Sequence, residues 1–165
     1  MNSAFDDLLK ANREYAERHS LGGFDGIAHA GVAMVTCMDS RIEPLEMIGL
    51  SVGDAKILRT PGGRLTPDAL TGCILGVHLL GVDRILIVPH TRCAMGGGDD
   101  ADLARQVREA TGADVSGLRL GASPDQLARL AEDVVRLREH PLIAGRAKVG
   151  GFRYDVDTGE VREIC

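Results

Sequence analysis

Two apolar runs in this sequence each lead to side chains that bind metals. The run at 32–35 is followed by Cys37, and the run at 85–88 is followed by His90 and Cys93. Thiolates and a neutral imidazole suit Zn²⁺, and catalytic zinc sites use three protein ligands so that a fourth position stays open. Cys37, His90 and Cys93 are therefore candidate ligands of a zinc ion.

The same three residues also fit a purely structural role. Free cysteine packs as a small buried hydrophobe, so Cys37 and Cys93 could simply belong to the core. His90 would then be a loop histidine whose hydrogen bonds are satisfied. A His-x-x-Cys spacing occurs by chance, and the metal hypothesis gains its strength from the distant cysteine at the end of another expected strand.

Asp39 and Arg41 add two charged groups beside the first thiol. Alternate residues of an extended segment point the same way, so Cys37, Asp39 and Arg41 could line one side of a cleft. Asp39 is then either a fourth zinc ligand or a partner of Arg41 that leaves the metal open to water. The alternative is an ordinary ion pair at a helix start, with Asp39 or Ser40 as the N-cap.

The elements that must position these residues alternate between strand and helix. Short β-branched apolar runs predict strands, and apolar residues at helical spacing predict helices. This alternation favours an α/β fold with a mostly parallel sheet flanked by helices. Along the chain we expect a leading helix 3–18, strand 32–35, a short helix 43–50, strand 55–59, a helix from the N-cap Thr66 to Gly81, strand 85–88, helix 101–110, a helix from a capping box at 123–126 to His140, a brief strand 142–144 and a hairpin 148–163.

Strand order decides whether the reactive ends meet. Ligands of open α/β sheets lie beyond the carboxyl ends of strands, where the strand order reverses. We expect the order 2-1-3-4, with the C-terminal hairpin, turning at 157–159, as the edge. The strands that lead to Cys37 and His90 then become neighbours, about 5 Å apart.

Length, charge and composition narrow the function classes. The chain has 165 residues and a formal net charge of −5, which favours a single domain over 1–165 and, without a basic aromatic cluster, argues against a nucleic-acid partner. No apolar run reaches the ~20 residues of a membrane span, and no signal-peptide pattern opens the sequence. We expect a cytoplasmic protein with no membrane partner, whose cysteines are free, catalytic or metal-bound.

The leading segment 1–22 carries an amphipathic helix that Asn12 interrupts on its apolar side. Such a helix must cover either its own domain or a partner subunit, because its apolar side chains otherwise face water. Its apolar stripe consists of Phe5, Leu8, Leu9, Tyr15 and Ala16.

Taken together, the motifs resemble those of the β-class carbonic anhydrases. The segment from Cys37 to Arg41 is similar to the Cys-x-Asp-x-Arg motif of that family, and the segment from His90 to Cys93 to its His-x-x-Cys motif. The intervening 59–63, Arg-Thr-Pro-Gly-Gly, resembles the Arg-Asn-x-Gly-Gly loop of the family. The resemblance covers nearly the whole chain, in the same order.

This resemblance implies a zinc enzyme that reversibly hydrates carbon dioxide to bicarbonate and a proton. Zinc would be held by Cys37, His90 and Cys93, and Asp39 with Arg41 would form a catalytic dyad. When paired with Arg41, Asp39 orients the nucleophile; when the pair breaks, Asp39 binds zinc and closes the site. The resemblance also implies a homodimer or homotetramer in which the leading helix wraps the partner subunit.

The implied substrate pocket contains several departures from the family pattern. Thr60 stands where the family usually has Asn, and Pro61 stiffens the turn that follows. Ala94 replaces the glycine that usually follows the second cysteine, and Arg92 adds a positive charge between two ligands. The pocket residues implied by the resemblance are Ser40, Thr60, Gly62, Gly63 and Ala94.

These departures keep two other functions open. The same site could hydrolyse an analogue of carbon dioxide, carbonyl sulfide or carbon disulfide, or the chain could be a non-catalytic zinc protein in which Asp39 permanently occupies the fourth position. A nucleotide-binding role is disfavoured, because no Gly-x-Gly-x-x-Gly run follows the first expected strand and the sequence has no Walker lysine.

Overall fold

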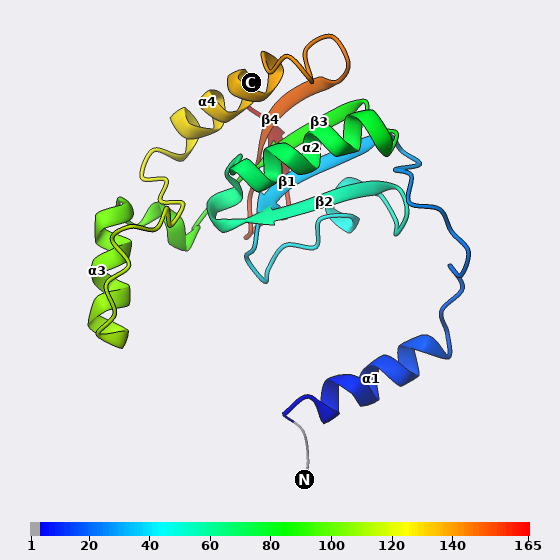
Figure 1. Ribbon diagram of the computed structural model, residues 1–165, viewed down its shortest axis with the longest axis horizontal. Helices are drawn as coiled ribbons and strands as arrows, with labels where there is room; N and C mark the ends of the chain where they lie inside the picture. Colours follow the sequence, from blue (N-terminus) through cyan, green and yellow to red (C-terminus); the bar gives the residue numbers. More distant parts are fainter. Residues whose placement is uncertain (1–3) are drawn as a thin grey trace.

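A five-stranded sheet forms the centre of the molecule in a computed structural model that describes residues 4–165 (Figure 1). The strands lie in the order β2-β1-β3-β4-β5. This order confirms the expected arrangement, including the reversal after the first strand. The strands are β1 (Val32–Cys37), β2 (Ala55–Thr60), β3 (Arg84–Val88), β4 (Lys148–Tyr154) and β5 (Val161–Glu163); the helices are α1 (Asp6–Ala16), α2 (Pro67–Leu79), α3 (Asp100–Thr111) and α4 (Gln126–Arg138), with single 3₁₀ turns η1 (Glu46–Ile48), η2 (Pro61–Gly63) and η3 (Ala94–Gly96).

The register of the parallel strands aligns their carboxyl ends. In β1, Cys37 is paired with Thr60 of β2, and Thr36 is paired with Val88 of β3. Strand β4 continues the parallel sheet beside β3, and β5 turns back antiparallel to β4, which confirms the C-terminal hairpin. Because the three neighbouring strands end at one edge, the residues that follow them must share that edge.

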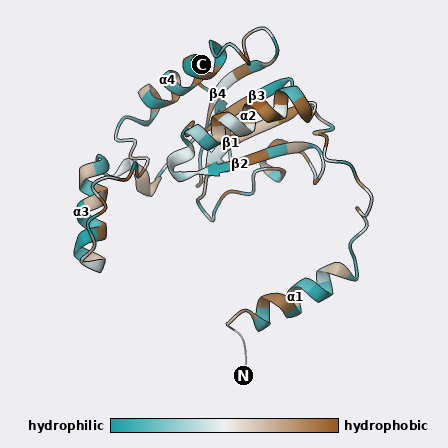
Figure 2. Ribbon diagram, in the orientation of Figure 1, coloured by the Kyte–Doolittle hydropathy of each residue, from teal (hydrophilic) through white to brown (hydrophobic). Residues whose placement is uncertain are grey.

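Strand β1 is buried along its whole length because both faces of the sheet are covered there. Helices α2 and α4 pack on one face, where Val35, Ile87 and Leu137 belong to one core cluster. Figure 2 shows apolar residues along the strands and on α2. On the other face Met34 is fully buried, and Ile42 of the segment after β1 is buried as well.

Helix α2 forms as its sequence predicts. The side chain of Thr66 accepts a hydrogen bond from the backbone N–H of Ala69, and Pro67 occupies the first helical position, where its missing N–H costs nothing. Gly81, just past the helix end, has a φ of +75°, a backbone conformation that favours glycine. Cys73 is fully buried in the core, as expected from its place on the apolar stripe.

Two expected elements are wrong because their backbone groups find turn partners instead. Residues 43–50 form no α-helix: only Glu46–Ile48 make a 3₁₀ turn, closed by Gly49 at a φ of +70°. Residues 142–144 form no strand, because the N–H groups of Ile143 and Ala144 both donate to the carbonyl of His140. This tight turn leaves no extended segment to join the sheet.

Helix α4 starts later than its sequence suggested. The expected capping box at Ser123 is wrong, because the backbone N–H of Ser123 donates to the carbonyl of Met95 and holds this residue in a loop. Asp125 is the N-cap instead, and its carboxylate accepts from the N–H of Ala128. Aspartate caps helices as well as serine does, so the local sequence does not decide whether Ser123 or Asp125 is the N-cap.

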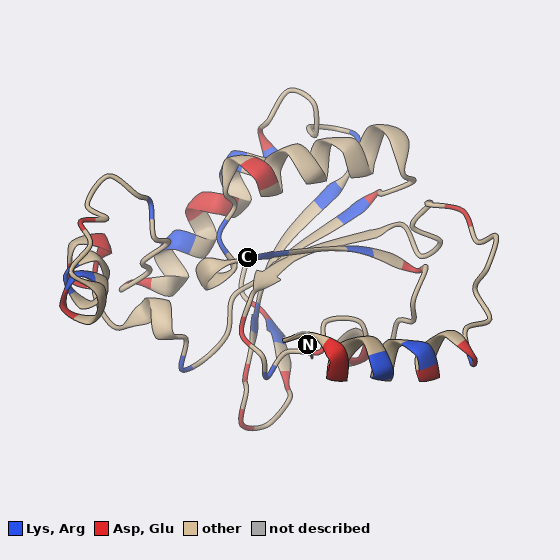
Figure 3. Cartoon of the chain, turned by 60° about the horizontal axis from the view of Figure 1, so that its bottom comes forward, with Lys and Arg blue, Asp and Glu red and all other residues tan. Residues whose placement is uncertain are grey.

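Helices α1 and α3 extend away from the sheet (Figure 1). Helix α1 has no buried residue, and Phe5, Leu8, Leu9 and Tyr15 are each more than half exposed. It carries both acidic and basic residues (Figure 3). Helix α3 begins with a capping box between Asp99 and Asp102.

The helices of the described part of the chain are short. None of those within residues 4–165 is long and apolar enough to cross a bilayer.

Candidate metal centre

Three metal-binding side chains converge at the carboxyl edge of β1 and β3. The ligand atoms of Cys37, His90 and Cys93 all lie within 4.8 Å of one another. The two sulfur atoms are 3.9 Å apart. Cys37 and His90 are buried, and Cys93 is half-buried. The strand order therefore brings together residues that are 53 and 56 positions apart in the sequence (90 − 37 and 93 − 37).

His90 presents one free ring nitrogen to this cluster. Its Nδ1 lies 2.8 Å from the carbonyl oxygen of Thr91 and donates a hydrogen to it. The other nitrogen, Nε2, is buried and has no hydrogen-bond partner among the described residues. A buried polar atom without a partner is costly, whereas a histidine that donates through one nitrogen and binds metal through the other is the usual arrangement at metal sites.

The donor set fits zinc in geometry as well as in chemistry. Two sulfurs that are each ~2.3 Å from a tetrahedral zinc lie about 3.8 Å apart, and the observed separation is 3.9 Å. The unpartnered Nε2 of His90 supplies the third donor. The three residues could hold a zinc ion and leave a fourth position open.

The two thiols share one negative charge readily. The hydrogen bond from the Cys93 thiol lowers the pKa of Cys37 to about 4, against the opposing effect of burial, and contact with His90 lowers it further. The pKa of Cys93 is raised by the same pairing and by its burial. A thiolate next to a second thiol and an imidazole is poised to bind a cation.

Asp39 lies beside the cluster but is bound to Arg41. Nε and Nη2 of Arg41 donate to the two carboxylate oxygens at 2.9 and 2.7 Å, and the backbone N–H of Arg41 donates at 3.0 Å. These bonds hold the pKa of Asp39 far below its usual range, and burial opposes them only weakly. Oδ2 of Asp39 is 3.7 Å from Nε2 of His90, so the carboxylate borders the metal position while paired.

Three side chains near this pair, those of Arg59, Arg41 and Gln126, make contacts that were not predicted from the sequence. Arg59 donates through Nε to the carbonyl of Cys37 at 3.0 Å and through Nη2 to the carbonyl of Asp39. Nη2 of Arg41 also donates to the carbonyl of Arg92 at 3.1 Å, which has a φ of +51°. The sequence identified Arg59 as a motif residue but did not predict that it would bind the carbonyls of Cys37 and Asp39.

Gln126 is the third of these side chains. Its side-chain amide donates to the carbonyl of His90 at 2.8 Å. The expected capping box at 123–126 assigned this side chain to its own helix, and nothing local to the sequence indicated a partner in the segment after β3. Helix α4 therefore helps to fix the backbone that carries His90.

The five residues assigned to the substrate pocket lie in different surroundings. Gly62 and Gly63 both have positive φ, and a Cβ on Gly63 would stand 3.2–3.3 Å from the backbones of Pro89, Val88 and Cys37. This close approach places the glycine turn against the ends of β1 and β3. The Thr60 hydroxyl is buried and donates to the carbonyl of Arg64 at 2.8 Å, while Ser40 and Ala94 are exposed.

The fold is an α/β sheet whose switch point carries a candidate metal site of two thiols and an imidazole, next to a carboxylate–arginine pair. The carbonic anhydrase family model matches residues 32–161. The chain belongs to this family, and its relatives place it in the β class.

Relatives from several organisms resemble the chain over almost its full length. Beta-carbonic anhydrase 1 of Mycobacterium tuberculosis is 30% identical over 167 residues, covering 96% of each chain. The crystal structure of a carbonic anhydrase from Streptococcus mutans has a TM-score of 0.90 at 34% identity, covering 100% of this chain and 99% of that chain. A carbon disulfide hydrolase of Acidithiobacillus thiooxidans is 29% identical over 172 residues, covering 90% of this chain and 78% of the relative.

Proposed function

We propose that the protein catalyses the zinc-dependent, reversible hydration of carbon dioxide to bicarbonate and a proton. The observation that carries this proposal is the buried, unpartnered Nε2 of His90, which faces two thiols and borders a carboxylate held by Arg41. Family membership supports the same activity. Carbon dioxide and bicarbonate are then the small-molecule substrates.

Cys37, His90 and Cys93 are the proposed zinc ligands. Zinc, when bound, acts as a Lewis acid that lowers the pKa of water and so supplies the nucleophile. The thiolates of Cys37 and Cys93 bring negative charge to the site and weaken this acidification. We therefore expect the rate to rise between about pH 7 and about pH 9.

Asp39 and Arg41 are proposed to prepare the fourth position. Arg41 keeps Asp39 ionised and turned aside, because both carboxylate oxygens accept from the guanidinium. An ionised Asp39 can accept a hydrogen bond from the attacking water and orient its lone pair toward carbon. If the pair breaks, Asp39 is close enough to the metal position to occupy it, which would close the site.

The pocket is proposed to lie over the glycine turn, between Gly62, Gly63 and the end of β3. The glycine at 63 allows the backbone to approach the ends of β1 and β3 closely, and we propose that the substrate, a small linear molecule, lies against this turn. Ser40, Thr60 and Ala94 are the remaining proposed pocket residues. Of these, Thr60 acts on the shape of the turn, since its hydroxyl is used by Arg64.

Hydrolysis of carbon disulfide is the second candidate function. Four relatives described as carbon disulfide hydrolases match the chain at 27–29% identity, and the methyl group of Ala94 alters the pocket rim. Stopped-flow measurements with each substrate, at about pH 7 and about pH 9, separate the two. Hydration of carbon dioxide that disappears on zinc removal supports the first function, and its absence at both pH values contradicts it.

Metal content tests the ligand assignment apart from activity. We expect about one zinc per chain, lost in the Cys37→Ser variant because a hydroxyl is a poor zinc ligand. The matched control is Cys73→Ser, which changes a buried thiol of the core. Retention of zinc by the Cys37→Ser variant would rule out the proposed ligand set.

We also propose that the protein is a homodimer or homotetramer in which segment 1–22 packs on a partner subunit. Relatives of the same fold from Sordaria macrospora are tetrameric, and the apolar stripe of α1 is exposed here. Light scattering should show the oligomer dissociating in a Leu8→Asp/Leu9→Asp variant. Lys10→Asp, on the polar side of α1, is the control and should leave the molar mass unchanged.

A further inference from the structure

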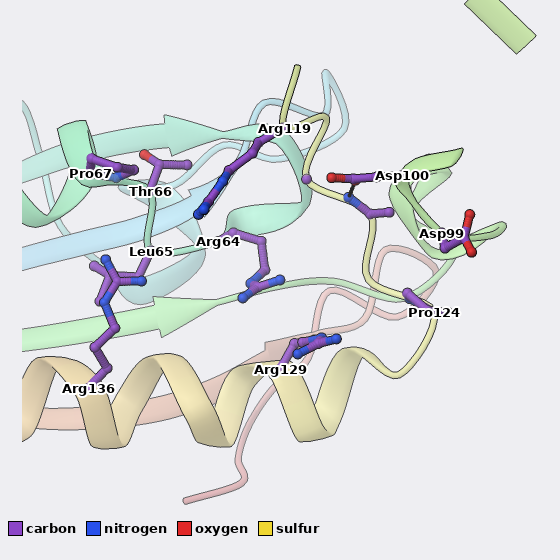
Figure 4. Close-up of a pocket in the computed structure, with 12 residues that line it drawn as sticks. Arg64, Leu65, Thr66, Pro67, Asp99, Asp100, Arg119, Pro124, Arg129 and Arg136 are labelled. Atoms are coloured by element: carbon purple, nitrogen blue, oxygen red, sulfur yellow. Dashed lines mark hydrogen bonds between the residues drawn. The ribbon is translucent and has the colours of Figure 1, made fainter. Parts of the chain in front are cut away.

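A cavity of about 600 Å³ lies apart from the metal centre, between α4 and the loop that precedes it (Figure 4). Its lining includes none of the three proposed zinc ligands. Four arginines from three separate segments line it: Arg64 follows the glycine turn, Arg119 comes from the loop, and Arg129 and Arg136 come from α4. Such a gathering of like charges requires an explanation.

Arg64 is immobilised at the base of this arginine cavity. Its Nε and Nη2 donate to the two carboxylate oxygens of Asp133 at 2.6 and 3.2 Å. Asp133 is almost completely buried and also accepts from the backbone N–H of Leu65 at 3.0 Å. A guanidinium has five N–H donors, so this pairing fixes its orientation while leaving donors for a ligand.

Two of the other arginines have no acidic partner. Within residues 4–165, no carboxylate forms an ion pair with Arg119 or Arg136. Figure 4 shows both side chains directed toward the Arg64–Leu65 segment from opposite sides. Arg129 pairs with Glu132 at 2.8 Å, but both side chains are largely exposed, so solvent weakens that pair.

The two acidic residues of the lining form no ion pair with these arginines among residues 4–165. Asp99 accepts from the backbone N–H of Asp102 at 2.9 Å as the N-cap of α3. Asp100 accepts from the backbone N–H of Ala122 at 2.9 Å. Both carboxylates therefore accept from backbone N–H groups, of α3 and of the loop before α4, and neither forms an ion pair with Arg119 or Arg136.

We propose that the arginine cavity binds a small polyanion with two or more phosphate groups. Guanidinium groups match phosphate oxygens in two-bond contacts, and the volume lies in the usual range for small-molecule sites. No aromatic ring is among the lining residues, so recognition acts on the charged groups and not on a stacked base. This proposal does not depend on the activity proposed for the metal centre.

Isothermal titration calorimetry on the zinc-loaded full-length protein tests the proposal, with inorganic pyrophosphate and inorganic phosphate as probes at constant ionic strength. We expect saturable binding of pyrophosphate, about tenfold or more tighter than that of phosphate, because more guanidinium groups can engage two phosphates. Arg119→Ala and Arg136→Ala should each weaken pyrophosphate binding about tenfold. Both side chains are exposed, so the fold should tolerate their loss.

The control variant is Arg162→Ala, which removes an exposed arginine of β5 outside the cavity. Its affinity for pyrophosphate should match that of the unmodified chain. Three outcomes overturn the proposal: no saturable binding, equal affinity for both probes, or binding that is unchanged by Arg119→Ala and Arg136→Ala. In the last case, metal analysis after the titration shows where the probe bound. Loss of zinc from the protein would mean that pyrophosphate bound the metal and not the arginine cavity.

Discussion

The molecule contains two carboxylate–arginine pairs with nearly the same geometry and very different surroundings. Asp39–Arg41 and Asp133–Arg64 each join both carboxylate oxygens to two guanidinium nitrogens, at 2.9 and 2.7 Å in the first and 2.6 and 3.2 Å in the second. The side chains of Asp39 and Arg41 are 17% and 41% exposed, whereas those of Asp133 and Arg64 are 3% and 24% exposed.

Burial and sequence separation give the two pairs different uses. The buried pair joins residues 69 positions apart and ties the segment after the glycine turn to α4. Breaking it would leave a charge buried away from water, so this pair holds the fold together and keeps Arg64 fixed at the arginine cavity. The accessible pair joins residues two positions apart, beside the Nε2 of His90. Water can solvate either charge there, so this pair can open and close at low cost, as the proposed catalytic role of Asp39 requires.

The largest expected effect is on catalysis, in the variant Asp39→Asn. The amide keeps the size of the side chain but loses the charge that accepts and orients a proton. We expect kcat/KM for carbon dioxide to fall by about 10² to 10⁴, with zinc content and melting temperature nearly unchanged. If the variant instead unfolds at a much lower temperature, the accessible pair stabilises the fold, and the proposed difference in use between the two pairs is contradicted.

The matched variant of the buried pair is Asp133→Asn, which should act on stability. It leaves Arg64 partly buried with no opposite charge, at a cost of about 3–5 kcal/mol in the free energy of unfolding. Chemical denaturation measures this loss. Turnover per folded, zinc-loaded molecule should stay close to that of the unmodified chain, and a large fall in turnover at full folding would contradict the assignment.

The thiols repeat this division between buried and reactive groups. Burial raises the pKa of Cys73 to about 12, whereas the pKa of Cys37 is lowered to about 4. In zinc-free protein at neutral pH, we expect iodoacetamide to modify Cys37 at least about a hundredfold faster than Cys73, because the thiolate is the nucleophile. Peptide mapping after timed labelling checks this, and equal rates would contradict it.

The same shift predicts how alkaline pH acts on the fold. The pKa of Cys73 is higher in the folded than in the unfolded chain, so its contribution to stability is complete below about pH 8.5. That contribution is lost as the pH rises toward about 12. The variant Cys73→Ala should therefore lose less stability than the unmodified chain over this interval, as thermal melts would show.

The contrast between the pairs also shows which features the sequence could predict. Cys37, Asp39 and Arg41 lie within five residues of one another. The alternation of strands and helices predicts the strand order that places His90 beside them. The expectation of neighbouring strand ends is confirmed because topology rules limit parallel sheets to few arrangements. Local patterns therefore sufficed for the residues that approach the metal position.

Asp133 and Arg64 could not be paired from the sequence. Asp133 lies between Leu130, Val134 and Leu137 on α4, and an isolated charge near an apolar stripe usually faces solvent. Its partner stands 69 positions earlier, and helix periodicity carries no information about such distances. The start of α4 was misplaced for a related reason, since the loop bond from Ser123 to Met95 decided it.

The smallest expected effect concerns the contacts that surround the accessible pair. Arg92 accepts a hydrogen bond from Arg41 through its carbonyl and pairs with Asp157 through its side chain at 2.5 Å. Its φ of +51° is strained for a non-glycine residue. The variant Arg92→Gly therefore relieves this strain, keeps the carbonyl and removes only an exposed ion pair.

We expect kcat/KM to change by no more than about threefold in Arg92→Gly and in Asp157→Asn, because exposed pairs contribute little. Stopped-flow assays on both variants measure this, and a loss approaching that of Asp39→Asn would mean that the accessible pair depends on the C-terminal hairpin.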